Sequence, residues 1–352
     1  MKVKNILIKI LVPIISVLCS FLVGAILIAC IGGNPLDAFS YLLRGAFGTK
    51  ANFGETIVKS VPLIFTGLAA TFAYKCGVFN LGAEGQLVMG AVTSIWIATT
   101  VKGVSGVGLV ILSLVLGAIA GGIWGAIPGI LKITRGLNEM IVSIMLNYIA
   151  ILFMGYLYSN PLREGSVPQT AAVSEKLSRI FSGTRVHTGI IIAMVLALGI
   201  YYFLFYTAAG FKLRAVGLNQ TASRFNGFPV NKLMLISFIV SGAIAGLGGS
   251  VELHGTQFRL MAGFGTGYGF DGVAIALIGQ LNPLGTVIVA YLFAILRTGA
   301  TTMQVGSGMP TSVIDIIQAL IIVFAVAGSA LVNLPKTRQI LANMFQNKTK
   351  EA

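Results

Sequence analysis

The sequence predicts an all-α fold, a polytopic bundle of about ten transmembrane helices with both termini in the cytoplasm. Of its 352 residues, 56% are hydrophobic and only 10% are charged, whereas a soluble globular domain carries about 25% charged residues. Long apolar runs follow one another along the chain and are separated by short polar breaks. A helix needs about 20 apolar residues to cross a bilayer, so we expect a single transmembrane domain over residues 1–352.

The expected spans are, in chain order, 10–31, 60–74, 86–101, 107–131, 140–158, 189–206, 233–253, 270–281, 284–299 and 312–331. The first run follows three lysines and ends at a stretch, Leu27 to Cys30, that resembles a lipoprotein cleavage box. It is longer than the apolar core of a signal peptide, which has about 7–15 residues. We therefore expect an uncleaved first span.

The distribution of basic residues indicates the orientation, because cytoplasmic loops are enriched in Lys and Arg. With the N-terminus inside and ten spans, 14 of the 24 Lys and Arg residues lie in inner segments and 9 in outer segments. Loop 208–232 and the tail 332–352 are then cytoplasmic, and the long loop 159–188 is external. The net charge of +14 does not predict a nucleic-acid partner, because the basic residues are scattered between apolar runs.

Two rows of small residues predict close helix packing. One row is Gly117, Gly121, Gly125 and Gly129; the other contains Ser241, Ala245 and Gly249, with Gly242, Gly246 and Ser250 beside it. Spacing by four places such residues on one helix face, where a neighbouring backbone can approach closely. Static packing and a helix interface that moves during a functional cycle would both use these rows.

The inner loop 208–232 has four basic residues and no acidic one. Asn219 can cap the start of a short helix over 220–226, and Gly227 can close its end, with Pro229 beyond. Phe225 would then be an apolar side chain on the helix surface. The loop is either a basic segment lying against anionic lipid or a docking element for a soluble partner.

The segment 79–90, FNLGAEGQLVMG, places Asn80, Glu84 and Gln86 among glycines between two apolar runs. Backbone that is not helical is tolerated at membrane depth only where it is buried in protein or lines a cavity. At depth the segment would be a pathway or gate element, and at the inner surface it would be a turn. The sequence leaves both interpretations open.

Asp271 is an acid close to the interior of a span, after a glycine-dense stretch. An ionisable residue inside a membrane is a functional candidate because it is costly there, although a carboxylate at a helix start is also stabilised by free N–H groups.

The external loop 159–188 mixes charges with an amphipathic stretch from Ala171 to Phe181. It fits a solvated connector, an outer docking surface or a substrate lid.

Four stretches together resemble the signature segments of permease subunits of ribose- and nucleoside-type bacterial ABC importers. They are FNLGAEGQLVMGA, GLNEMIVSIMLNYIA, LRAVGLNQTASRFNG and GYGFDGVAIALIGQLNPLG, and they follow the order of that family between residues 79 and 285. The Gly-Ala-Glu-Gly-Gln and Phe-Asp-Gly forms resemble the nucleoside branch. The length resembles that of the longer of two paired nucleoside permeases.

The resemblance implies a multi-pass protein of the bacterial plasma membrane that is not an enzyme and forms a pathway for nucleosides or a related sugar. The implied partners are cytoplasmic ATP-binding subunits, a second permease subunit in a heterodimer, an external substrate-binding lipoprotein and membrane lipid. No cofactor is expected on this chain, and ATP and Mg are expected on the partner subunits. The sequence agrees, because it contains no glycine-rich loop ending in Gly-Lys-Ser/Thr.

The candidate site residues follow from these segments, and none of them is expected to be catalytic or to bind a metal. The resemblance assigns an ATPase-coupling loop to Arg214, Gly217, Asn219, Ala222, Arg224, Phe225 and Gly227. The candidates for the translocation pathway are Asn80, Glu84, Gln86, Asn147 and Asp271.

A cation-coupled secondary transporter of small polar solutes is the alternative function. It would use Asp271 or Glu84 as an ion or proton site near interrupted helices. Such a transporter works alone, whereas an importer subunit requires an ATPase partner.

Overall fold

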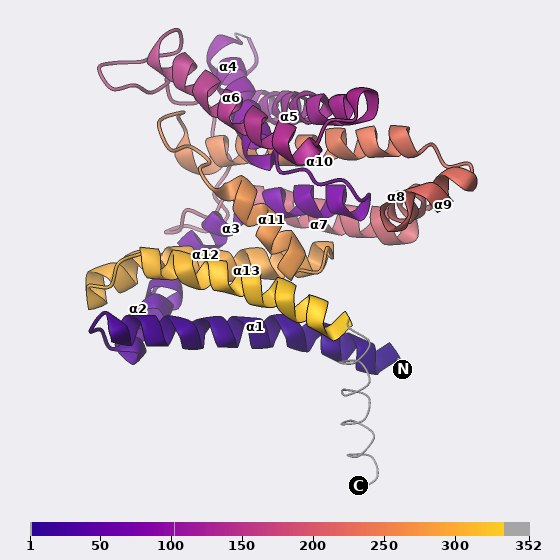
Figure 1. Ribbon diagram of the computed structural model, residues 1–352. Helices are drawn as coiled ribbons and strands as arrows, with labels where there is room; N and C mark the ends of the chain where they lie inside the picture. The colour runs from indigo at the N-terminus through magenta and orange to yellow at the C-terminus, as the bar shows by residue number, and fades with distance from the viewer. Residues whose placement is uncertain (1, 102, 334–352) are drawn as a thin grey trace, which may run out of the picture. The chain divides into compact units, whose positions relative to one another are not determined.

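The computed structural model describes residues 2–101 and 103–333, and the secondary-structure elements over these ranges are helices (Figure 1). They are α1 (Lys2–Cys30), α2 (Pro35–Phe47), α3 (Lys50–Lys75), α4 (Ala83–Thr100), α5 (Val107–Arg135), α6 (Glu139–Ser159), α7 (Gly189–Tyr206), α8 (Ala208–Leu218), α9 (Gln220–Phe225), α10 (Val230–Glu252), the π-helical turn η1 (Leu253–Gln257), α11 (Tyr268–Ile278), α12 (Pro283–Ser307) and α13 (Ser312–Asn333). The predicted all-α class is confirmed.

Every apolar run predicted from the sequence falls on one of these helices. Six elements in the described part of the chain are long and apolar enough to cross a membrane, namely α3, α5, α6, α7, α10 continued by η1, and α12. Ile15–Cys30, Tyr268–Ile278 and Ser312–Gly328 are shorter apolar helical stretches. The count of ten spans and the cytoplasmic termini stay predictions. Most of the predicted tail 332–352, residues 334–352, lies outside the described residues.

Helix α2 was not predicted, because it is not an apolar run. It has Pro35 at its first position, where a proline is favoured. The side chain of Asn34 closes the helix start, since its Oδ1 accepts from the Leu36 N–H at 3.0 Å and its Nδ2 donates to Asp37 at 2.9 Å. These capping signals are local, but they precede a helix too short and too polar to resemble a span.

Contacts divide the chain into two compact units, Met1–Gly45 with Gly299–Ala352 and Ala46–Thr298. Within the first unit, α1 packs against α13. Within the second unit, α3 is the central helix, and residues 60–74 of this helix are all buried. The candidate site residues all belong to the second unit.

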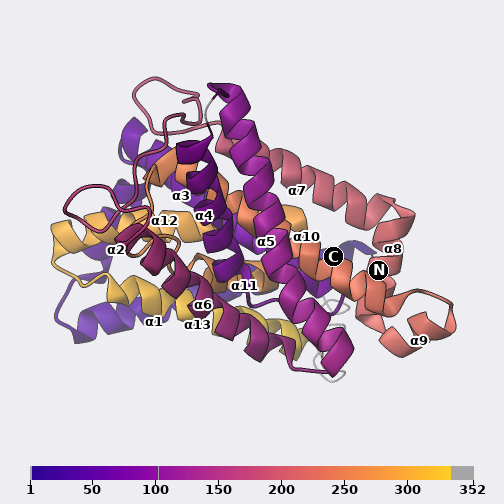
Figure 2. The same ribbon diagram turned by 90° about the horizontal axis from the view of Figure 1, so that it is seen from above.

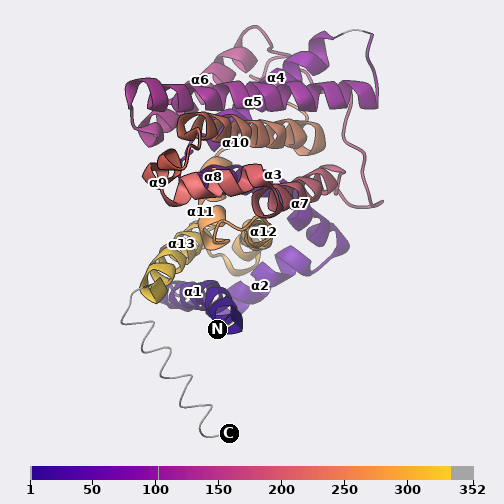
Figure 3. The same cartoon turned by 90° about the vertical axis from the view of Figure 1, so that its right-hand side faces the viewer.

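The two small-residue rows meet in the second unit, where α5 packs against α10 and both pack against α4. Figures 1 and 3 show α5 and α10 running side by side. A Cβ added to Gly125 would lie 2.6 Å from the Phe238 carbonyl oxygen, so the two backbones are almost in direct contact. The packing predicted from the rows is therefore confirmed.

Replacing Gly246 with alanine is expected to destabilise the folded protein by about 1–3 kcal/mol, because the new methyl group overpacks the α5–α10 interface. Its Cβ would lie 2.6 Å from the Gly117 carbonyl oxygen and 2.8 Å from the Gly121 Cα. Gly199→Ala in α7 is the matched control, since nothing lies within 4 Å of its added Cβ. Thermal unfolding in detergent measures both variants, and equal melting temperatures for the two would contradict the prediction.

Candidate functional site

Residues 78–82 form a non-helical segment between α3 and α4 that lies inside the second unit. Asn80 is fully buried, and its Nδ2 donates a hydrogen bond to the Ser241 hydroxyl at 2.8 Å. Ser241 lies in the middle of α10, and its hydroxyl donates to the Ala69 carbonyl of α3 at 2.8 Å. The segment therefore lies at the level of helix interiors, where non-helical backbone must be buried or line a cavity.

Amide side chains satisfy the polar groups of this break. Asn80 and Gln86 exchange two hydrogen bonds, of 2.9 and 3.0 Å, and Asn80 Oδ1 also accepts from the Gly82 N–H at 2.9 Å. Asn147 of α6 accepts from the Gly85 N–H and donates to the Leu81 carbonyl, both at 2.9 Å. Three of the five predicted pathway residues therefore belong to one buried network around the start of α4, and their role in a pathway stays a prediction.

Asp271 lies in the first turn of α11, so the predicted position at a helix start is confirmed. It forms an ion pair with Arg297 of α12, with Nη2 and Oδ2 2.6 Å apart. The Arg297 guanidinium also lies over the Tyr268 ring, 5.1 Å from its centroid. Sequence reasoning missed this pairing, because Arg297 stands alone within the next predicted span.

Glu84 lies beside the Asp271–Arg297 pair. It is only 5% exposed, the backbone amides of Gly267 and Gly269 approach its carboxylate, and the charges of Asp271 and Arg297 act on it. A Cβ at Gly269 would lie 2.7 Å from the Glu84 Cα, so α4 and α11 meet here without a side chain between them. The structure thus brings together two predicted pathway residues that are far apart in sequence.

Sequence reasoning missed Glu252. It is the last residue of α10, is 2% exposed and accepts a hydrogen bond from Gln257 at 3.4 Å. Its charge acts on Tyr268, as do those of Asp271 and Arg297. The signal that could have identified it is an acid at the end of an apolar run, followed by the polar residues of η1.

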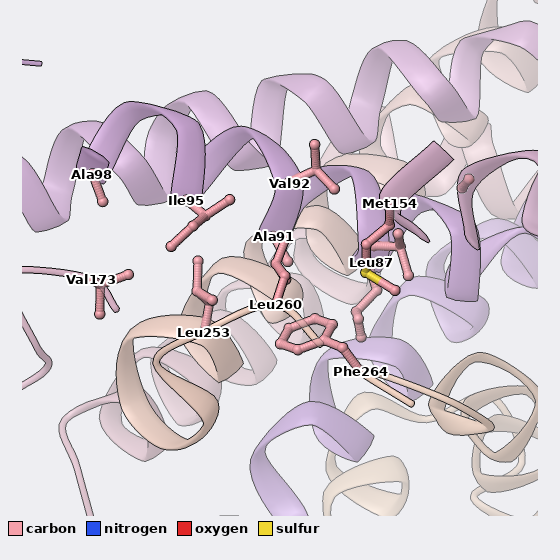
Figure 4. Close-up of a cluster of buried hydrophobic side chains, with 12 residues drawn as sticks. Leu87, Ala91, Val92, Ile95, Ala98, Met154, Val173, Leu253, Leu260 and Phe264 are labelled. Carbon is pink, nitrogen blue, oxygen red and sulfur yellow. The ribbon is translucent and has the colours of Figure 1, made fainter. Parts of the chain in front are cut away.

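The long loop 159–188 lies against η1 and the residues after it. The backbone N–H groups of Thr170, Val173 and Leu177 donate to the carbonyls of residues 260, 258 and 254 at 2.9–3.1 Å. Figure 4 shows Val173 in the same apolar cluster as Leu253 and α4 side chains. The loop is therefore bound along the end of α10, and its predicted role as an outer docking surface or lid stays open.

His187 ends this loop and is buried. Burial first, and then the neighbouring Arg185 charge, lower the pKa of His187 to about 4, so its ring is neutral at pH 7. Its Nδ1 accepts a hydrogen bond from the Gly189 N–H at 3.1 Å. Within the described ranges no three His, Cys, Asp or Glu side chains are placed to hold a metal.

The predicted short helix of the inner loop is confirmed as α9. Asn219 caps its start by accepting from the Ala222 N–H at 2.9 Å. Gly227 closes its end with φ +77°, while the Gly227 and Phe228 N–H groups donate to the Arg224 and Ser223 carbonyls, both at 3.0 Å. This pair of hydrogen bonds at the end of the helix is a Schellman motif. The loop also contains α8, which was not predicted.

Two exposed apolar side chains project from this pair of helices, Phe225 as predicted and Leu218, which sequence reasoning missed; each is 89% exposed. A groove of about 430 Å³ lies between α8 and α9, lined by residues of both helices such as Ala215 and Ala222. Figure 2 shows α7 leading into α8, with α9 beyond it. Arg214 instead packs its guanidinium over the Phe205 ring, 5.1 Å from the centroid.

Gly217, near the end of α8, touches the end of α3. A Cβ on Gly77 would lie 3.0 Å from the Gly217 Cα, and a Cβ on Gly217 would lie 3.0 Å from the Cys76 carbonyl carbon. Gly77 has φ +75° and directly precedes the non-helical segment at residues 78–82. The α8–α9 pair, which we call the α8–α9 element, is therefore in backbone contact with the chain that leads into the polar network.

Comparison with known proteins identifies similar chains. The family described as "Branched-chain amino acid transport system / permease component" matches residues 52–326. The guanosine ABC transporter permease protein NupP of Bacillus subtilis is 40% identical over 91% of this chain and 94% of its own length. The nucleoside ABC transporter permease protein NupB of Lactococcus lactis is 35% identical over 97% and 98%. The glucose ABC transporter permease protein TsgB13 of Haloferax volcanii is 33% identical over 89% and 86%.

Proposed function

Because this chain belongs to the branched-chain amino acid transport system / permease component family, we propose that it forms the translocation pathway for nucleosides in an ATP-driven importer. It is an integral protein of the plasma membrane and a transport subunit rather than an enzyme. ATP-binding subunits and a substrate-binding protein complete such an importer, and ATP and Mg belong to the ATP-binding subunits.

Nucleosides are favoured as substrate because the two relatives of higher identity, at 40% and 35%, are named for guanosine and nucleoside transport, whereas the relative at 33% is named for glucose. Guanosine, other nucleosides and glucose share a ring that carries several hydroxyl groups. The pathway must therefore offer hydrogen-bond partners to hydroxyl groups, and an otherwise apolar bundle with a buried polar network provides them.

The observation that best supports an ATP-coupled mechanism is the contact between the α8–α9 element and the polar break. We assign ATPase docking to the residues named from the sequence, Arg214, Gly217, Asn219, Ala222, Arg224, Phe225 and Gly227. A partner seated on the exposed Phe225 would move α8, and α8 touches Gly77 through Gly217. Movement of packed elements between two discrete arrangements is how such transitions are transmitted.

The pathway is assigned to the polar network and the acidic residues beside it, that is Asn80, Glu84, Gln86, Asn147 and Asp271. In the proposed topology ten spans return both termini to the cytoplasm, so the α8–α9 element is cytoplasmic and loop 159–188 is external. The external loop then faces a substrate-binding lipoprotein. The second permease subunit is proposed to be a different chain, giving a heterodimer.

The cation-coupled alternative is less well supported by the geometry. It needs a carboxylate able to bind an ion, but Asp271 is paired with Arg297 at 2.6 Å. Glu84 lies within the field of the same arginine. A cation at Asp271 would have to compete with a guanidinium already in place, and a cation at Glu84 would be repelled by the same guanidinium.

Uptake measurements test the proposed function. Cells that contain this chain and its ATPase partners are expected to accumulate radiolabelled guanosine, and cells without this chain are expected to lose that uptake. Uptake should continue after ionophores collapse the proton and sodium gradients while cellular ATP is held constant. Loss of uptake under those conditions would favour the cation-coupled transporter. Accumulation of glucose in place of guanosine would show that the substrate is a sugar and not a nucleoside.

A further inference from the structure

Four of the ten Asp and Glu residues of the chain lie in one region of the second unit: the charges of Glu55, Glu252 and Asp271 act on Tyr268, and Glu84 lies by the backbone amides of Gly267 and Gly269, which flank Tyr268. They come from α3, α4, the end of α10 and α11. Carboxylates inside a membrane domain are costly and tend to mark transport pathways. The four acids differ in whether a basic side chain forms an ion pair with them.

Two of the four acids have a basic partner. Asp271 pairs with Arg297 at 2.6 Å, and Glu55 pairs with Arg185 at 3.5 Å. Glu84 and Glu252 form no ion pair of this kind within the described part of the chain. Charge compensation is therefore complete for the first two acids and incomplete for the others.

Glu84 and Glu252 are also the more deeply buried, with 5% and 2% exposure. Each carries one buried oxygen, Oε2, that accepts no hydrogen bond from any residue the structure describes. A buried acceptor without a donor costs free energy, and in native proteins it calls for an explanation such as a bound ligand. One such oxygen acts near the Tyr268 side chain and the other lies by the backbone that flanks Tyr268, and together they point to a ligand that supplies donors.

Both carboxylates lie where regular helix is interrupted. Glu84 follows the break at 78–82, and Glu252 directly precedes the π-helical turn η1. Helix breaks line binding sites in transport proteins because they free polar groups inside the membrane, and π-helical turns occur frequently at functional sites. Tyr268 begins α11 after a glycine-dense approach, and α4, which carries Glu84, contacts both α11 and η1.

We propose that Glu84 and Glu252, together with Tyr268, form the site that holds the sugar ring of the substrate during translocation. This inference rests on the proposed function. The ligand is a compound with several hydroxyl groups, since the carboxylate oxygens that lack donors can accept from hydroxyls. Arg297, held over the Tyr268 ring, keeps that side chain in position.

Isosteric Glu84→Gln and Glu252→Gln variants test this site. The complex with its ATPase subunits and loaded binding protein is reconstituted in lipid vesicles, and guanosine uptake and ATP hydrolysis are measured together. A hydrogen bond to a charged acceptor is lost in each variant, so uptake is expected to fall by about tenfold or more. ATP hydrolysis stimulated by the binding protein should stay within about twofold of wild type, because docking and coupling residues are unchanged.

Asp315→Asn is the matched control, because Asp315 lies in the first turn of α13 in the first unit and is exposed. It should leave both rates unchanged. Unaltered uptake in the Glu84 and Glu252 variants would overturn the proposal, and so would a parallel loss of uptake and ATP hydrolysis, which indicates a structural role. Absence of guanosine uptake in the wild type would instead refute the proposed function, so the two failures are distinguishable.

Discussion

Replacing Arg297 with alanine is expected to destabilise the folded protein by about 3 kcal/mol or more, because Asp271 would lose its ion pair inside the bundle while keeping its charge. The two side chains are 28% and 20% exposed, and their charged atoms are 2.6 Å apart. Arg297 also acts on Glu84 and covers the Tyr268 ring, so its loss affects two carboxylates and an aromatic contact. Unfolding of the purified protein in detergent measures the loss.

The chain provides a control for this pair. Arg185 pairs with Glu55 at 3.5 Å, but its side chain is 53% exposed, so Arg185→Ala should cost less than about 1 kcal/mol. The double variant Asp271→Asn with Arg297→Gln should recover part of the loss, because no uncompensated Asp271 charge remains. Equal losses for the two arginine variants would show that the Asp271–Arg297 pair is no more important than a surface ion pair.

The predicted helices depended on patterns that are local in sequence. A run of about 20 apolar residues specifies a membrane helix without knowledge of its neighbours, so each run fell on a helix. The α9 caps were equally local, since Asn219 and Gly227 act on backbone groups within a few residues. Helix α2 was not predicted because it is short and carries charges near both ends.

The partners within the candidate site could not be predicted in the same way. Asp271 and Arg297 lie on separate helices, and Glu252 reaches Tyr268 only because η1 and the following glycines turn the chain back. The network of Asn80, Gln86 and Ser241 likewise depends on how α10 packs beside α3. Residue types identified the candidates, but tertiary packing decided which acids were compensated.

The α8–α9 element gives the other large expected effect. Phe225→Ala is expected to reduce ATP hydrolysis stimulated by loaded binding protein by about tenfold or more in the purified complex. A phenylalanine that becomes buried on docking contributes roughly 1.5–3 kcal/mol, and about 1.4 kcal/mol corresponds to tenfold in affinity. Phe225 is 89% exposed in the isolated chain, so its removal should not alter the stability of the permease itself.

Gly227→Val should have a similar effect for a different reason. Gly227 has φ +77°, where a β-branched side chain is strained by roughly 1–2 kcal/mol, and its Schellman motif fixes the end of α9. Nothing lies within 4 Å of a Cβ built there, so the effect acts through the backbone conformation of α9 and not through a clash. Membrane insertion and substrate capture by the binding protein should remain normal in both variants.

Arg224→Ala distinguishes docking from lipid contact, since Arg224 lies on the same short helix and is exposed. An exposed ion pair with a partner contributes less than about 1 kcal/mol, so this variant should keep most of its stimulated ATP hydrolysis. A loop that only lies on anionic lipid would respond in the opposite way, because lipid attraction depends on basic charge. If Arg224→Ala alone impairs stimulation while Phe225→Ala and Gly227→Val do not, the α8–α9 element does not dock an ATPase, and the contact between Gly217 and Gly77 has no coupling role.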